Sequence, residues 1–227
     1  MLVLAIDTAG PDCAIAIAQS EAAVATILAR ASERIGRGHA ERLMPMIEAT
    51  LSKAGVAFED LARIAVTTGP GSFTGVRIGV AAARGLALAL DITAVGIGSL
   101  EALASPLVRT ARYGTVAAAL DAKRGEVFGF IQNGVSGEVL VESSAFPVAD
   151  FAILLRRFPT TIALVGNGAP LVASDDFGLE VAGTAESPDI AGVALLALKA
   201  ATDAPPTPLY ARGADAKPQH DKALARL

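Results

Sequence analysis

The sequence IAVTTGPGSFTGVRIGVAAARGLALAL, from Ile64 to Leu90, decides how this chain folds. Its first four residues are apolar or β-branched, as in a buried strand, and the glycine-proline-glycine turn at 69–71 ends that strand. Most of the following residues are alanine, leucine, valine or isoleucine, and the hydroxyl of Ser72 or Thr74 can cap the first turn of a helix. The stretch therefore predicts a buried strand, a sharp turn and a long helix.

The predicted helix carries minimal side chains every four residues, at Gly75, Gly79, Ala83 and Ala87, which places them along one ridge. A glycine inside a helix costs roughly 1 kcal/mol relative to alanine, so Gly79 and Gly85 indicate close packing. One interpretation is a docking ridge for another helix, in which case Gly79→Leu would weaken pairing with little loss of the isolated fold. The alternative is a helix buried in the core of its own chain, and both can hold on opposite faces.

Composition limits the class of protein. The 227 residues suffice for one large domain or two lobes. Hydrophobic residues make up 52% of the chain and the mean hydropathy is +0.50, yet no uninterrupted apolar run reaches the roughly 18 residues of a membrane span. Residues 1–7 lack the basic leader of a secretory signal, and the single Cys13 has no partner for an internal disulfide. We expect a cytoplasmic protein that does not enter a membrane.

The net charge of the chain limits which partners it can bind unaided. The net charge is −4, and lysine and arginine are dispersed along the chain. Proteins that grip nucleic acid unaided present a clustered basic surface, because they neutralise phosphates. Any role in RNA chemistry therefore needs a partner that supplies this surface.

The order of predicted elements repeats. Three apolar runs, residues 2–6, 13–18 and 22–29, predict antiparallel strands, and the periodic pattern of His39 to Ala54 predicts a helix that ends at Gly55. Near Tyr113 the same order restarts with a strand at 116–120, a return strand at 126–132 and a third strand at 139–142. Both halves then continue with a helix, a strand and a helix.

This duplication predicts an α/β fold of two lobes built from βββαβα units. We expect an N-terminal lobe at residues 1–104, a C-terminal lobe at 105–212 and a mobile tail at 213–227. The plan is that of the actin-like sugar kinases and chaperone ATPases, a comparison made on fold alone. In both halves the first strand ends in an aspartate at a turn, and we expect these two residues, Asp7 and Asp121, to face the cleft.

Two short segments form a candidate nucleotide or anion site. Glycines let backbone N–H groups approach an anion, and a helix N-terminus adds favourable partial charge. The residues of this candidate site are Asp7, Thr8, Gly69, Pro70, Gly71 and Ser72. No lysine follows Gly75, so the segment is not a P-loop, and the favoured alternative is a purely structural turn between strand and helix. Asp7 can likewise cap its own turn, and for Asp121 and Lys123 this structural role is favoured.

The chain offers few groups for metal binding or catalysis. Its two histidines are His39 and His220, and four residues after His39, where a helical partner ligand would lie, stands Leu43. With one cysteine and no histidine near a serine motif, nucleophilic triads find no support. We expect no catalytic residue and no metal site.

Six segments together resemble the bacterial TsaB (YeaZ) family. They are Ile6–Thr8, His39–Ile47, Gly69–Gly79, Ser99–Leu103, Asp121–Glu126 and Pro208–Arg212. The resemblance extends over nearly the whole chain, and the block GPGSFTGVR is highly specific. Two residues depart from the family pattern: Ala9, where the family often has serine, and Ala211, where it often has leucine.

The resemblance implies a two-lobed actin-like fold and a role in making threonylcarbamoyladenosine, the modified base beside the anticodon of certain tRNAs. In that system the related subunit TsaD holds the metal with a His-x-x-x-His pair and transfers the threonylcarbamoyl group. Here the pair is reduced to His39 and Leu43. The implied role is therefore that of a non-catalytic partner that pairs with and activates TsaD.

Family members pair with TsaD, and also with themselves, through two helices that correspond here to residues 39–54 and 74–90. The implied interface residues are Leu43, Ile47, Thr74, Gly75, Ile78, Gly79, Ala82 and Ala83. The ATPase TsaE joins the pair, ATP or ADP is implicated at the junction, and tRNA is met only through the complex. The alternatives are a metallopeptidase, which would bind zinc or iron, and an autonomous small-molecule kinase of the same fold.

Overall fold

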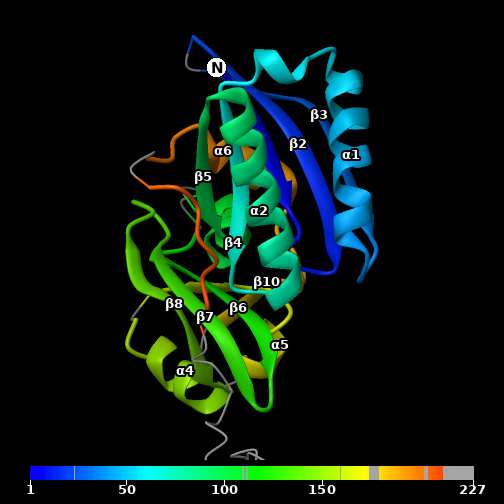
Figure 1. The fold of residues 1–227 in the computed structure, drawn as a ribbon. Coiled ribbons are helices and arrows are strands. Elements are labelled where there is room, and N and C mark those ends of the chain that lie inside the picture. Colours follow the sequence, from blue (N-terminus) through cyan, green and yellow to red (C-terminus); the bar gives the residue numbers. More distant parts are fainter. Residues whose placement is uncertain are drawn as a thin grey trace, which may run out of the picture.

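The computed structural model describes residues 1–22, 24–108, 110, 112–158, 160–173, 179–201 and 204–211. Two five-stranded mixed sheets form the two lobes (Figure 1). The first has the order β3-β2-β1-β4-β5, with antiparallel pairing among β1–β3 and parallel pairing of β4 with both β1 and β5. Its strands are β1 (Leu2–Asp7), β2 (Asp12–Glu21), β3 (Val24–Arg34), β4 (Arg63–Gly69) and β5 (Thr93–Gly98).

The second sheet repeats this topology with the order β10-β9-β6-β7-β8. Its strands are β6 (Thr115–Lys123), β7 (Glu126–Asn133), β8 (Val139–Pro147), β9 (Ile162–Val165) and β10 (Leu179–Gly183). The helices are α1 (His39–Ala54), α2 (Phe73–Leu90), α3 (Ser99–Ala104), α4 (Val148–Leu155), α5 (Ala169–Val172) and α6 (Ile190–Ala197), with short 3-10 turns at Phe58–Asp60 and Ser105–Leu107. The two-lobed α/β fold predicted from the sequence is confirmed.

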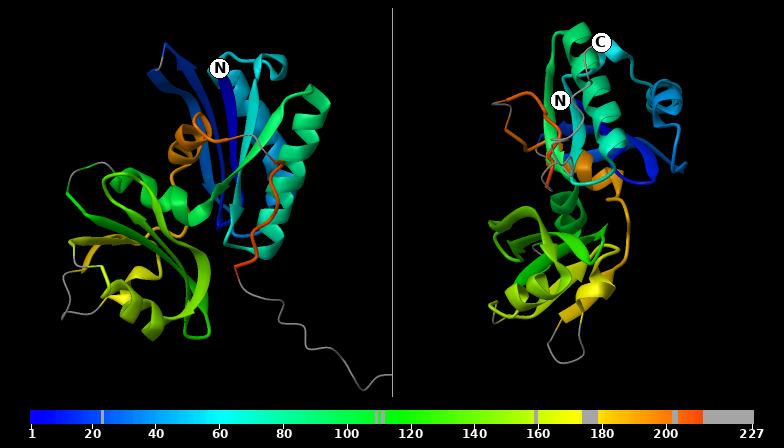
Figure 2. Two further views of the ribbon diagram at one scale, coloured as in Figure 1. Left: turned by 90° about the vertical axis from the view of Figure 1, so that its left-hand side faces the viewer. Right: turned by 60° about the horizontal axis from the view of Figure 1, so that its bottom comes forward.

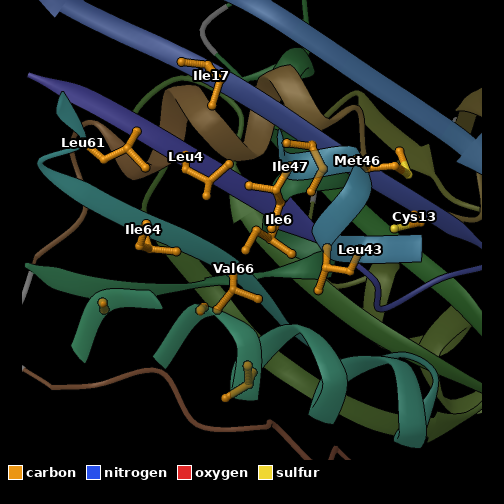
Figure 3. Packing of buried hydrophobic residues seen from close by; sticks show 14 of the residues in the cluster. Leu4, Ile6, Cys13, Ile17, Leu43, Met46, Ile47, Leu61, Ile64 and Val66 are labelled. Carbon is orange, nitrogen blue, oxygen red and sulfur yellow. The ribbon is translucent and has the colours of Figure 1, made fainter. Parts of the chain in front are cut away.

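Helices α1 and α2 cover one face of the first sheet (Figures 1 and 3). Leu43 and Ile47 of α1 pack with Ile6 and Val66 of the central strands, and the buried face of α2 completes this cluster. Local chemistry sets the ends of both helices. Gly55 ends α1 in a left-handed conformation, and the Ser72 hydroxyl caps α2 by accepting a bond of 3.2 Å from the Gly75 N–H.

The opposite faces of the sheets are covered by helices that the lobes exchange. Helix α6, from the second half of the sequence, packs on β1 and β2 of the first sheet, whereas α3 places Leu100 and Leu103 on the second sheet. The Arg63 guanidinium fixes α6 by donating to the carbonyl oxygens of Ala197 and Ala200 at 2.5 and 3.1 Å. The predicted boundary at residue 104 therefore needs correction, because each lobe borrows a helix from the other half of the chain.

The observed order is βββαβαβα in both halves, one strand and one helix longer than the predicted repeat unit. Strand β10 was not expected, and the predicted third strand at 22–29 is β3, which extends to Arg34. The tail at 213–227, which we expected to be mobile, lies outside the described residues, as does His220. Residues 204–211 return along the first lobe and pass between the lobes (Figure 2).

Candidate functional site

The turn after β1 encloses Asp7 completely. Its Oδ1 accepts bonds from the Thr67 hydroxyl at 2.5 Å and the Ala9 N–H at 2.9 Å, and the side chain is fully buried. Its other oxygen, Oδ2, is buried without a hydrogen-bond partner. Burial raises the pKa of this carboxyl above its ordinary value, because the charged form loses its hydration, although the bonds from Thr67 and Ala9 oppose this.

Thr8 lies beneath the first turns of α2. Its hydroxyl donates to the Gly75 carbonyl at 2.8 Å. A Cβ added at Gly75 would lie 2.0 Å from the Thr8 carbonyl oxygen, and one added at Gly79 would lie 2.4 Å from the Thr8 hydroxyl. Only glycine therefore fits at these two positions, where α2 crosses the turn after β1. Asp7 and Thr8 do not reach the cleft, so their assignment to a nucleotide site was wrong.

The ridge of small residues on α2 faces inward, not toward a partner. Gly75, Gly79, Ala83 and Ala87 are buried against the first sheet, as are Leu43 and Ile47 of α1. Their sequence-based assignment to a docking surface is corrected, since sequence spacing shows that residues share a face but not what covers it. Of the predicted interface residues, Thr74 is exposed, and Ile78 and Ala82 are half-buried.

A pocket of about 520 Å³ lies between the lobes. Gly71 and Ser72 line its first-lobe side, and Asp121, Lys123 and Asn167 line the other. The remaining two residues of the predicted turn site, Gly69 and Pro70, are buried. Of the six candidate nucleotide-binding residues, two therefore reach the pocket.

Asp121 lies in the pocket wall but is already partnered. Its Oδ1 accepts from the Lys123 N–H at 2.8 Å, its Oδ2 pairs with Lys123 Nζ at 2.6 Å, and its own N–H donates to Asn167 Oδ1. The bond from Lys123 lowers the pKa of the Asp121 carboxyl. Asp7 is enclosed and Asp121 is paired with Lys123, and the expectation that this chain alone holds no nucleotide tightly stays a prediction.

Among the described residues, no group of three or more histidine, cysteine, aspartate or glutamate side chains is placed to hold a metal ion. His39 is buried at the start of α1, where its Nε2 lies 3.2 Å from the Asp12 carbonyl oxygen. Leu43, at the position of the missing ligand, packs in the core. The absence of a metal site stays a prediction that metal analysis must test.

The outer face of α2 is unusual for a surface helix. By length and composition alone α2 could span a membrane, with a mean hydropathy of 1.4, but its inner face packs on β4 and 33% of its residues are buried. Its outer face exposes Phe73 and Leu88, the latter 85% exposed. An exposed apolar surface of this kind is typical of a binding face.

A cluster that the sequence analysis did not anticipate joins α2 to the returning segment 204–211. The Arg77 Nε donates to the Tyr210 hydroxyl at 2.8 Å, and its Cζ lies 3.7 Å above the centroid of the Phe73 ring. The rings of Phe73 and Tyr210 are 5.5 Å apart between centroids. The motif at 208–212 was noticed in the sequence, but no pattern links it to residues 133 positions earlier.

Comparison with known proteins places the chain in a family. The family model described as "TsaD: tRNA N6-adenosine threonylcarbamoyltransferase" matches residues 27–147, which is more than half of the chain. A Bacillus subtilis protein named tRNA threonylcarbamoyladenosine biosynthesis protein TsaB is 34% identical over 176 residues, which cover 75% of this chain and 73% of that protein. This chain belongs to the TsaB (YeaZ) family.

Further relatives agree. The TsaB protein of Escherichia coli is 38% identical over 128 residues, which span 56% of this chain and about half, 53%, of that protein. A solved structure from Pseudomonas aeruginosa, described as similar to the peptidase YeaZ, matches with a TM-score of 0.76 and 27% identity and covers 93% of this chain and 99% of that one. The resemblance seen in the sequence is confirmed.

Proposed function

We propose that this chain is an accessory, non-catalytic subunit in the formation of threonylcarbamoyladenosine in tRNA. In this role it packs against a TsaD-like transferase through the outer faces of α1 and α2 and holds that enzyme in an active form. The names of the TsaB relatives and the match to the TsaD family model support the pathway. The observation that carries the pairing is the outer face of α2, where Phe73 is 57% exposed and Leu88 is 85% exposed.

Charge supports a partner of the same fold. The exposed face of α1 carries Glu41 and Glu48, and that of α2 carries Arg77 and Arg84. In a roughly two-fold arrangement, each α2 would meet the partner's α1, so that arginines approach carboxylates around an apolar centre. A second copy of this chain could form the same contact, and a homodimer is part of the proposal.

The non-catalytic role is supported by the contacts that the candidate site residues already make within the chain. Asp7 and Thr8 are enclosed within the first lobe, and Asp121 holds the turn after β6. We propose that ATP or ADP enters at a junction with the transferase and a TsaE-like ATPase, where Gly71 and Ser72 line the pocket. The chain alone is then expected to bind nucleotide weakly and not to hydrolyse it.

The test is a tRNA modification assay with purified components, each omitted in turn. We expect threonylcarbamoyladenosine only when this chain and the transferase are both present. Full activity of the transferase alone would contradict the accessory role. ATP turnover by this chain alone, or a stoichiometric zinc or iron ion required for peptidase activity, would replace it with an enzymatic function.

A surface variant localises the contact. Leu88→Lys places a charge on the exposed end of α2 without disturbing the core, and we expect it to weaken pairing at least about tenfold. The matched control is Ile153→Lys, since Ile153 is also an exposed apolar residue, 58% exposed, but lies on α4 of the other lobe. Equal pairing by both variants, measured by analytical ultracentrifugation, would rule out the outer face of α2.

A further inference from the structure

The cluster of Phe73, Arg77 and Tyr210 lies on the same outer face of α2 that the proposed function assigns to pairing. Phe73 is 57% exposed and Tyr210 is 50% exposed. Two large aromatic rings left half in water around a guanidinium form an unusual surface for a chain without a partner. Tyrosine and arginine are the residue types most enriched among the few that dominate protein interfaces.

The guanidinium of Arg77 is held in one orientation. Its Cζ lies over the Phe73 ring, and its Nε donates a hydrogen bond to the Tyr210 hydroxyl. No carboxylate pairs with it among the described residues. The two terminal nitrogens therefore remain as a fork fixed in space, the geometry that binds a carboxylate through two parallel hydrogen bonds.

Tyr210 is fixed by backbone contacts on both sides. The Leu209 N–H donates to the Thr68 carbonyl at the end of β4, at 2.8 Å, and the Ala211 carbonyl accepts from the Ala145 N–H of β8, at 3.1 Å. Residues 204–211 thus span both lobes along the side of α2 (Figures 1 and 2). Strands of both sheets therefore hold the backbone on either side of Tyr210.

We infer that Arg77, clamped between Phe73 and Tyr210, is the anchor through which α2 binds a carboxylate of the partner subunit. The inference rests on the proposed function and adds the residue pair that fixes the partner's position. A protein carboxylate fits better than an RNA phosphate, because Arg77 lies one turn from the exposed apolar residues Phe73 and Ala81 and the chain has a net charge of −4. A partner of the same fold presents such groups on its own α1, as this chain does with Glu41 and Glu48.

The experiment measures the affinity of the full chain for the TsaD-like subunit by calorimetry at two salt concentrations. We expect Arg77→Ala to weaken binding at least about tenfold and to reduce its salt dependence. Arg77→Lys, which keeps the charge but lacks the fork, should recover only part of the loss. Tyr210→Phe removes the acceptor for Nε alone and should weaken binding about two- to tenfold.

Arg156→Ala is the matched control, since it removes another exposed arginine, from the second lobe. Thermal melting checks that each variant is folded. If Arg77→Ala does not fold, the conservative variants Tyr210→Phe and Arg77→Lys still test the anchor. If the wild type does not bind the subunit, the proposed function fails. If it binds, but Arg77→Ala binds equally well or loses only tRNA binding, the anchor is wrong and the proposed function stands.

Discussion

The two lobes contain the same aspartate turn, but the turn is buried in the first lobe and partly exposed to solvent in the second. In each, a central strand carries an aspartate in its last three residues, and the Oδ1 of this aspartate accepts the N–H two residues later, Ala9 for Asp7 and Lys123 for Asp121. Asp7 is fully buried, whereas the Asp121 side chain is 23% exposed and pairs with a lysine. The helix after the neighbouring strand makes the difference: α2 has 18 residues and covers the first turn, whereas α5 has four. The same local pattern thus yields a core residue in one lobe and a half-buried residue in the pocket wall in the other.

The largest expected effect comes from a substitution that disrupts the packing of α2 on the turn after β1. Gly79→Leu would drive a side chain into the Thr8 hydroxyl, 2.4 Å from the added Cβ, so we expect a loss of about 3 kcal/mol in the free energy of unfolding. This reverses the sequence-based expectation of an intact fold. Gly85→Ala is the control on the same helix, because the space beside Gly85 is open, and it should stabilise by about 0.5–1 kcal/mol. Urea unfolding of both variants measures the difference.

The buried aspartate should show a pH dependence of its own. Because the pKa of Asp7 is raised in the folded chain, its favourable contribution is complete below the ordinary value of 3.8 and is lost as pH rises through the folded pKa. Asp7→Asn keeps the shape without the charge. We expect the unfolding free energy of this variant to rise relative to that of the wild type as pH increases above 3.8, by on the order of 1 kcal/mol. A difference in unfolding free energy that does not change with pH would contradict the buried environment of Asp7.

Asp121, the half-buried aspartate of the second lobe, should show the opposite pH dependence of stability. The bond from Lys123 lowers the pKa of Asp121, so its contribution is present above the ordinary value of 3.8 and is lost as pH falls through the folded pKa. Asp121→Asn should therefore lose about 0.5 kcal/mol at neutral pH and nothing in acid. Urea unfolding at pH 7 and pH 3 gives the comparison. A loss above about 2 kcal/mol at pH 7 would show that this turn is as critical as the first.

The smallest effect concerns reactivity and leaves stability unchanged. Cys13 lies in the same buried interior as Asp7, and burial, with a smaller contribution from the Asp7 charge, raises the pKa of its thiol to about 11. We expect iodoacetamide to label the folded chain slowly at pH 8, since the thiolate is the reactive form. Labelling in rising urea then reports the opening of the first lobe. Rapid labelling without denaturant would place Cys13 at the surface.

Local sequence signals predicted most of the fold, because the residues that decide each element are neighbours in the chain. The bounds of α1 and the Ser72 cap of α2 follow directly from such signals. Contacts between residues that lie far apart in the sequence could not be predicted. Spacing placed Gly75 and Gly79 on one ridge but could not say that Thr8 covers it, and nothing in the sequence joins Arg77 to Tyr210. Strand β10 was missed because its five residues carry little hydrophobic pattern.

The exchange of helices between the lobes bears on how such a chain can be divided. A fragment that stops after the 3-10 turn at Ser105–Leu107 would keep every strand of the first sheet but lose α6, leaving the face formed by Val3, Ala5 and Ala65 open to water. The complementary fragment would lack α3 for its own sheet. Neither piece is therefore a self-sufficient domain, but each carries the cover that the other needs. Cut at this point, the chain is a natural candidate for a split protein whose halves recover their structure only together.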